Sequence, residues 1–170
     1  TTFIITQRTG ACQRIALANN DYTRQTLLPD LLVGSQFSTV GISHLTTSHR
    51  HLKKPVLTAV ETETGFVLNG FCPWVTGATQ ADTLVIGATL EDGNQILTVV
   101  PTSLTGVALH DPAHLVALTS SHTGRVSMEN VEVDRKWLLG GPSENIMAAG
   151  VGARTGGLQT STLAIGLAGA

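Results

Sequence analysis

Trp74 and Thr76 are the residues of this sequence best suited to hold a planar ligand. They stand two positions apart at the end of an apolar run, and Gly77 follows them as a turn residue. Side chains of a β-strand alternate between faces, so a strand here would expose the indole and the hydroxyl side by side. A flat apolar ring beside a hydrogen-bond donor suits a heteroaromatic ligand with carbonyl and ring-nitrogen acceptors. A core tryptophan beside an internally satisfied threonine fits the pattern equally well.

A second polar cluster lies between residues 43 and 54. Its basic side chains are His44, His49, Arg50, His51, Lys53 and Lys54. The segment contains no carboxylate and has no matching distant pair of ligands, so we expect no metal site. A phosphate contact by Arg50 or the lysines is favoured over a metal, because guanidinium forks match phosphate oxygens. A solvated loop is favoured over both.

Several common catalytic arrangements are absent from the sequence. There is no G-x-S-x-G nucleophile elbow and no G-x-G-x-x-G dinucleotide fingerprint. No pair of carboxylates is spaced for general acid–base catalysis; Glu61 and Glu63 flank a predicted turn and read as solvated. The motifs therefore favour neither a serine hydrolase nor a Rossmann-type dehydrogenase.

Composition narrows the class of protein further. The 170 residues carry a formal net charge of -2, which argues against a nucleic-acid partner. Charged residues make up only 13%, so we expect partners or missing segments to cover part of the surface. No apolar run reaches the roughly 18 residues of a membrane span. Cys12 and Cys72 lie far apart and indicate reduced thiols, as in a cytoplasmic protein.

The hydrophobic pattern predicts helices first and strands afterwards. Helices are expected over residues 3–20 and 26–33, and a small-residue helix over 158–170. Strands are expected at 37–42, 56–61, 66–69, 83–89, 95–101, 107–109 and 125–133. About six to eight short strands after helices predict an α+β fold built around a barrel or sandwich. Both ends of the chain read as cut, since Thr1 is not an initiator methionine and the final residues offer no helix cap.

The order of several short motifs is similar to that of a known family. The segment 66–89 contains FVLNG, WVTGA and AD-LVIGA, and Gly106-Val107, Ser121-His122-Thr123 and Leu138-Leu139-Gly140 follow in turn. Together these resemble the middle β-domain of the acyl-CoA dehydrogenase family. The resemblance implies short N-terminal helices, an antiparallel β-barrel and the start of a C-terminal helix bundle. It divides the chain into residues 1–35, the end of the N-terminal domain, residues 36–142, the middle domain, and residues 143–170, the start of the C-terminal domain.

The resemblance also implies a cofactor and site residues. FAD would lie between the barrel and the C-terminal helices, with Trp74, Val75 and Thr76 flanking the flavin ring and Thr76 donating to it. The family's T-E-P-x-x-G-S-D run, whose Thr also meets the flavin, is replaced here by the region of Ile42, Ser43 and His44. Arg50 and Ser121 are the candidate substrate-binding residues. The catalytic carboxylate is expected beyond Ala170.

The activity implied is 2,3-dehydrogenation of an acyl thioester, with hydride transfer to flavin N5. The partners implied are acyl-CoA or a related substrate, an electron-transferring flavoprotein or oxygen, and further copies of the chain in a homodimer or homotetramer. The sequence departs from the family where Thr119 replaces an arginine and where the E-P and G-S-D elements are missing. These departures keep two alternatives open: a flavin monooxygenase or oxidase on the same fold, and a non-catalytic barrel.

Overall fold

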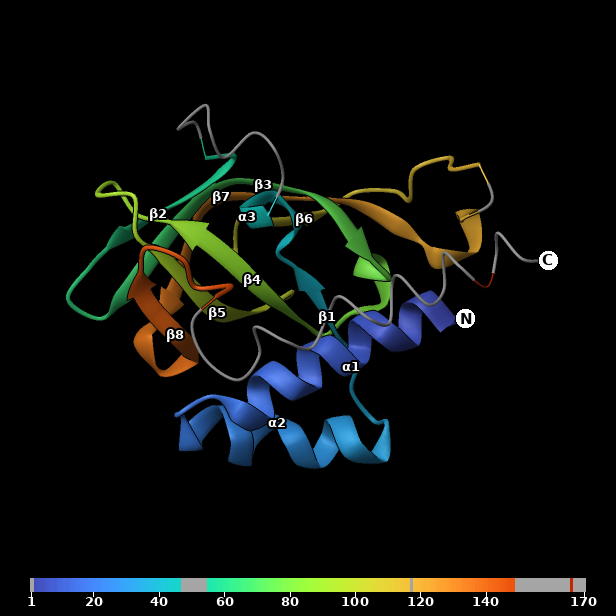
Figure 1. Cartoon of the computed structure of the whole chain (residues 1–170), viewed down its shortest axis with the longest axis horizontal. Coiled ribbons are helices and arrows are strands. Elements are labelled where there is room, and N and C mark those ends of the chain that lie inside the picture. The colour runs from blue at the N-terminus through green and yellow to red at the C-terminus, as the bar shows by residue number, and fades with distance from the viewer. Residues whose placement is uncertain (1, 47–54, 117, 149–165, 167–170) are drawn as a thin grey trace.

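The computed structural model describes residues 2–46, 55–116, 118–148 and 166, and Figure 1 shows their arrangement. The helices are α1 (Thr2–Leu17), α2 (Asp21–Val33) and the short α3 (Ser43–Thr46). The strands are β1 (Ser38–Gly41), β2 (Leu57–Glu61), β3 (Gly65–Thr76), β4 (Thr83–Thr89), β5 (Gln95–Pro101), β6 (Val107–Leu109), β7 (Thr123–Asp134) and β8 (Leu138–Ser143). In the described part of the chain, 3-10 turns also lie between strands: η2 (Ala78–Gln80), η3 (Thr119–Ser121) and η4 (Arg135–Trp137). Helices followed by strands confirm the α+β class.

Some predicted boundaries differ from the observed ones. Helix α2 begins at Asp21 rather than near residue 26, because the Asn20 side chain caps it by accepting a hydrogen bond from the Thr23 amide. The predicted strand 66–69 and the corner after it form one long strand, β3. Strand β3 stays paired with β7 through two register shifts, one between Leu68 and Gly70 and one between Cys72 and Val75. The helix predicted over 158–170 lies, apart from Gly166, outside the described residues.

The eight strands form one open, curled sheet (Figure 1). Its strand order is β6-β7-β3-β2-β4-β5-β8, and β1 pairs with β4 beside this path. Most pairs are antiparallel, but β4 runs parallel to both β1 and β2. These two pairings depart from the antiparallel order expected of the barrel, so the observed sheet is mixed.

Two apolar clusters hold the sheet and the helices together. The larger one fills the curl of the sheet, and the smaller one lies between the sheet and helices α1 and α2, which lie side by side (Figure 1). Strand β4 contributes to both: Leu84 and Ile86 enter the larger cluster and Val85 enters the smaller one. Burial on both faces explains why β4 reads as an unbroken apolar run. Within the described ranges, no helix has the length and hydropathy needed to cross a bilayer.

A polar and aromatic joint fixes α2 to the sheet. The side-chain nitrogen of Asn20, Nδ2, donates to the carbonyl oxygens of Lys136 (2.8 Å) and Leu138 (2.7 Å). Beside it, the rings of Tyr22 and Trp137 meet edge to face, with centroids 5.3 Å apart. The helical layer is therefore attached to the sheet at its β8 end through specific bonds as well as apolar packing.

Candidate functional site

The end of β3 presents one exposed side chain, followed by two that are buried. Val75 is fully buried in the larger cluster, whereas Trp74 is 54% exposed. The β-bulge between Cys72 and Val75 inserts an extra residue here, so Trp74 stands out from the strand. Because side chains alternate along a strand, Trp74 and Thr76 lie on the face opposite to Val75. Only the backbone of Val75 is left to contact a ligand, since its side chain belongs to the core.

Thr76 differs from the sequence-based expectation in one respect. Its hydroxyl was expected to be exposed, but the residue is only 5% exposed. Its Oγ1 lies 2.9 Å from Thr123 Oγ1, across the β3–β7 ladder. The expectation of an exposed hydroxyl is therefore wrong, because strand β7, 47 residues further along the chain, supplies a partner that sequence spacing cannot show.

A glycine corner closes this end of the sheet. Gly77 has φ of +66°, and its amide donates to the carbonyl oxygens of both Ser121 (3.2 Å) and His122 (3.0 Å). A side chain at this position would also press on the Phe37 ring, 3.0 Å from an added Cβ. These two bonds hold the end of turn η3 against the residue that follows Thr76.

The segment after β1 comes next to the same strand. Gly41 packs so closely that an added Cβ would lie 3.2 Å from both Cys72 Sγ and a Val75 methyl. The predicted cofactor residues Ile42, Ser43 and His44 start from this point, and helix α3 rests on β3 and β4. The structure thus brings the two predicted cofactor segments together at β3, although they lie about thirty residues apart.

His44 is turned toward β4. Its Nε2 lies 2.7 Å from the carbonyl oxygen of Gly87, which can only accept, so Nε2 carries the proton. Burial lowers the pKa of His44, and the bond to the Gly87 carbonyl raises it by a smaller amount. The imidazole is therefore neutral at neutral pH. Gly87 is required beneath α3, because an added Cβ would lie 2.2 Å from a Leu45 methyl.

Of the two predicted substrate-binding residues, the structure describes Ser121 but not Arg50. Ser121 is buried and lies 2.7 Å, oxygen to oxygen, from Thr123, which links it to Thr76 through one intermediate hydroxyl. Arg50 lies outside the described residues, as do His49 and His51. Among the described residues, no three metal-ligating side chains come together.

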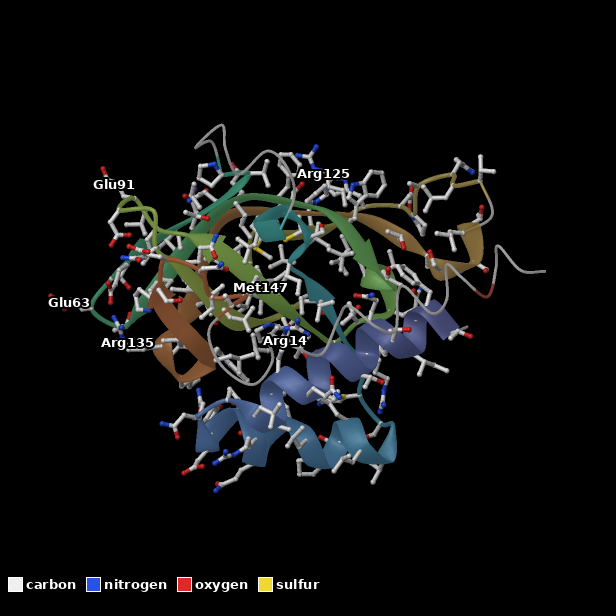
Figure 2. All side chains as sticks on the ribbon, viewed as in Figure 1. Arg14, Glu63, Glu91, Arg125, Arg135 and Met147 are labelled. Carbon is white, nitrogen blue, oxygen red and sulfur yellow. The ribbon has the colours of Figure 1, made fainter. Side chains whose placement is uncertain are left out.

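Sequence reasoning missed two neighbours of this site. Thr123, noted only as part of the S-x-T motif, is the central member of the hydroxyl group. Arg125 stacks on the Phe71 ring, with its guanidinium carbon 4.0 Å from the ring centroid. It lies on the side of the sheet away from α1 and α2 (Figure 2). The alternating pattern of residues 125–133 predicted a strand. The contacts of Thr123 and Arg125 could be found only from the register of that strand with β3.

The chain is similar in sequence and in fold to known proteins. No protein-family model matches the chain. It is 29% identical over 108 residues to probable acyl-CoA dehydrogenase YngJ of Bacillus subtilis, a match that spans 61% of this chain and 28% of that protein. A crystal structure of an FAD-dependent dehydrogenase matches with a TM-score of 0.75 and 26% identity, over 85% of this chain and 40% of that one.

Two further solved structures share the fold. An acyl-CoA dehydrogenase complexed with FAD from Bacillus anthracis has a TM-score of 0.75 at 22% identity, over 85% of this chain and 26% of that one. The prolyl acyl carrier protein oxidase AnaB has a TM-score of 0.74 at 20% identity, over 85% of this chain and 39% of that one. The fold is therefore acyl-CoA dehydrogenase-like. The chain itself covers only 26% to 40% of the length of these relatives. In both sequence and fold, the chain resembles a divergent member of the acyl-CoA dehydrogenase family.

Proposed function

We propose that this chain is the flavin-binding part of an acyl-CoA dehydrogenase-type enzyme. The reaction is 2,3-dehydrogenation of an acyl thioester, with the hydride passing to flavin N5. The observation that carries the proposal is Trp74: a large indole, 54% exposed, held out by a bulge beside fully buried Val75. The Trp74 indole belongs to neither apolar cluster, so its face is available to stack on a flat ring.

The residues at this end of β3 fit an isoalloxazine ring. Trp74 offers a flat apolar surface, and the Thr76 hydroxyl stands on the same strand face at the edge of the buried region. The neutral imidazole of His44 adds no positive charge to the neighbouring segment. When bound, FAD would supply the electron sink for hydride removal. Residues of this chain would hold the ring flat, exclude water from one face and fix its edge.

Two further parts of the proposed reaction lie outside the described residues. The carboxylate that removes the acyl α-proton is expected beyond Ala170, and Arg50 is a proposed contact of the substrate. Ser121 is proposed on the substrate side of the hydroxyl group. We further propose acyl-CoA or a related thioester as substrate and an electron-transferring flavoprotein or oxygen as acceptor. The assembly proposed is a homodimer or homotetramer in the cytoplasm.

Flavin titration of the full natural chain tests this proposal. The wild-type protein should take up FAD and show flavin absorbance after gel filtration, and added acyl-CoA should bleach that absorbance without oxygen. Trp74→Ala should weaken FAD binding about tenfold or more, as expected for the loss of a ring-stacking surface. Leu32→Ala is the matched control, because Leu32 is also an exposed apolar residue but lies on α2. A wild-type chain that shows no flavin absorbance after reconstitution contradicts the proposal.

A second candidate is a flavin oxidase or monooxygenase on the same fold. The likeness to AnaB, whose name describes an oxidase, favours it, as does the absence of the T-E-P and G-S-D elements. Oxygen consumption during turnover, without any electron-transferring flavoprotein, would distinguish this activity from a dehydrogenase. A third candidate, a non-catalytic interaction module, requires that the Trp74→Ala, Thr76→Ala double variant changes the binding of no ligand.

A further inference from the structure

Arg125 differs from the other arginines of the described ranges in its hydrogen bonding. Each of the others donates to an oxygen atom of the protein: Arg8, Arg14, Arg24 and Arg135. Within the same ranges, the Arg125 guanidinium donates to no acceptor and pairs with no carboxylate, Asp111 and Glu129 included. Because Arg125 is exposed, its N–H donors are available to a ligand.

An aromatic ring holds the Arg125 guanidinium in place. Its central carbon lies 4.0 Å from the centroid of the Phe71 ring. Stacking orients the guanidinium but leaves its N–H groups unused, because the ring attracts the cation through its π face. Arg135, near the other end of the β3–β7 ladder, stacks on Phe66 in a similar way at 5.3 Å. The charge of Arg135 is already paired with Glu61 at 2.9 Å, whereas Arg125 has no anion beside it among the described residues.

Arg125 lies on the same face of the sheet as Trp74. The register of the β3–β7 ladder places Arg125 opposite the irregular stretch after Cys72, which contains Trp74. Cys72 and its ladder partner Val126 are buried in the larger cluster inside the curl. Arg125 and Trp74 are exposed, so both lie on the outer face, away from α1 and α2 (Figure 2). A cation with unused donors therefore stands beside the surface proposed to stack on flavin.

His110 and Ser127 add hydrogen-bond donors next to Arg125. The His110 amide donates to the Arg125 carbonyl at 3.0 Å, and His110 Nε2 lies 2.8 Å from Ser127 Oγ. Ser127 stands two positions from Arg125 on β7 and so shares its face. If Nε2 donates, the Ser127 hydroxyl keeps its own proton for another acceptor; if Nε2 accepts, the proton on Nδ1 remains. In either arrangement the pair retains a donor near the guanidinium.

We infer that Arg125, His110 and Ser127 form a phosphate-binding site beside Trp74, and that its ligand is the diphosphate of a nucleotide ester. The choice of ligand rests on the proposed function, since FAD and acyl-CoA each carry a diphosphate attached to adenosine. A guanidinium fork matches two phosphate oxygens at once. The hydroxyl–imidazole pair offers a donor to a further oxygen. The stacked ring keeps the fork in one orientation, which lowers the entropy lost on binding.

Calorimetric titration of the full natural chain with inorganic diphosphate tests the inference. Arg125→Met keeps an unbranched side chain over Phe71 and removes the charge with its donors. The variant should bind diphosphate about tenfold more weakly or worse. Arg125→Lys, which keeps the charge but not the fork, should lose less. Arg135→Met is the matched control, because it also removes an arginine stacked on a phenylalanine of β3, and it should bind diphosphate as the wild type does.

Two pairs of ligands show which molecule supplies the diphosphate. If it is the cofactor, Arg125→Met should weaken binding of FAD about tenfold and leave riboflavin, which has no phosphate, unchanged. If it is the substrate, the variant should bind CoA more weakly but S-acetylpantetheine and FAD normally. An Arg125→Met protein with wild-type affinity for diphosphate, FAD and CoA overturns the inference and leaves the proposed function intact. A wild-type chain that takes up no flavin contradicts the proposed function, and the diphosphate and CoA titrations still decide whether the phosphate site exists.

Discussion

His44 Nε2 lies 2.7 Å from the carbonyl oxygen of Gly87 and joins helix α3 to the middle of strand β4. The bond is made by a half-buried, neutral ring whose pKa is lowered by burial. It sets the position of the segment that follows β1, which leads into residues proposed to line the cofactor site. The titration of this histidine therefore affects the fold beside the site.

We expect the stability of the protein to fall when His44 is forced to take up a proton. The pKa of His44 is lower in the folded protein than its ordinary value of about 6.5, so the unfolded chain binds the proton first. Stability should be complete above that value and decline as the pH falls below it, toward the lowered folded pKa. Urea unfolding at about pH 8 and about pH 5.5 measures this. His44→Gln, which keeps a donor for Gly87, should show a smaller loss; an identical loss would contradict the assignment.

Trp74 and Val75 should separate stability from ligand binding. Val75→Ala removes fully buried methyl groups and should destabilise the protein by about 2 kcal/mol. Trp74→Ala removes a half-exposed ring and should cost about 1 kcal/mol or less. Thermal unfolding of the flavin-free proteins makes the comparison. A Trp74→Ala protein that is less stable than Val75→Ala would mean that the indole belongs to the core.

The two cysteines should differ in reactivity toward a thiol reagent. Burial raises the pKa of Cys72 to about 12, so almost no thiolate forms at about pH 8. Burial also raises the pKa of Cys12, but that residue is only partly buried. In a Cys12→Ser variant, native protein should therefore resist labelling, and denaturant should expose one reactive thiol. Rapid labelling of the native variant would contradict the burial of Cys72 between β1 and β3.

Asn20 should stabilise the protein through its bonds to the sheet as well as through its cap. Asn20→Ala loses the cap to Thr23 and both bonds to the η4–β8 carbonyls, and it should cost about 2 kcal/mol. Asn20→Asp retains a good cap but turns a carboxylate toward the carbonyls of Lys136 and Leu138. It should therefore also be destabilising in chemical denaturation. An Asn20→Asp protein as stable as the wild type would mean that only the cap matters.

Local pattern was sufficient to predict much of the fold. The apolar run of β4 and the Asp-Gly turn before β5 predicted that hairpin, and the register Thr83↔Pro101 to Thr89↔Gln95 confirms it. The order of helices before strands predicted the α+β class. The parallel pairing of β1 with β4 could not be predicted, because it joins segments more than forty residues apart.

For the candidate site, too, the sequence predicted local features but not the contacts between distant segments. The W-V-T triplet was enough to predict a strand whose first and third side chains share a face. It could not show the bulge that lifts Trp74 out, because a bulge is a mismatch between β3 and β7. It also could not show that the Thr76 hydroxyl is covered, or that a half-buried His44 faces β4.

The sequence by itself determined which residues are apolar and which can bend the backbone, and therefore the order of most helices, strands and turns. Only the tertiary structure decided that Thr76, Thr123 and Ser121 lie within hydrogen-bonding distance of one another. The physical reason is that secondary structure follows from contacts between near neighbours. The hydrogen-bond partner of a hydroxyl, in contrast, is set by whichever distant strand or turn the folded chain brings to it.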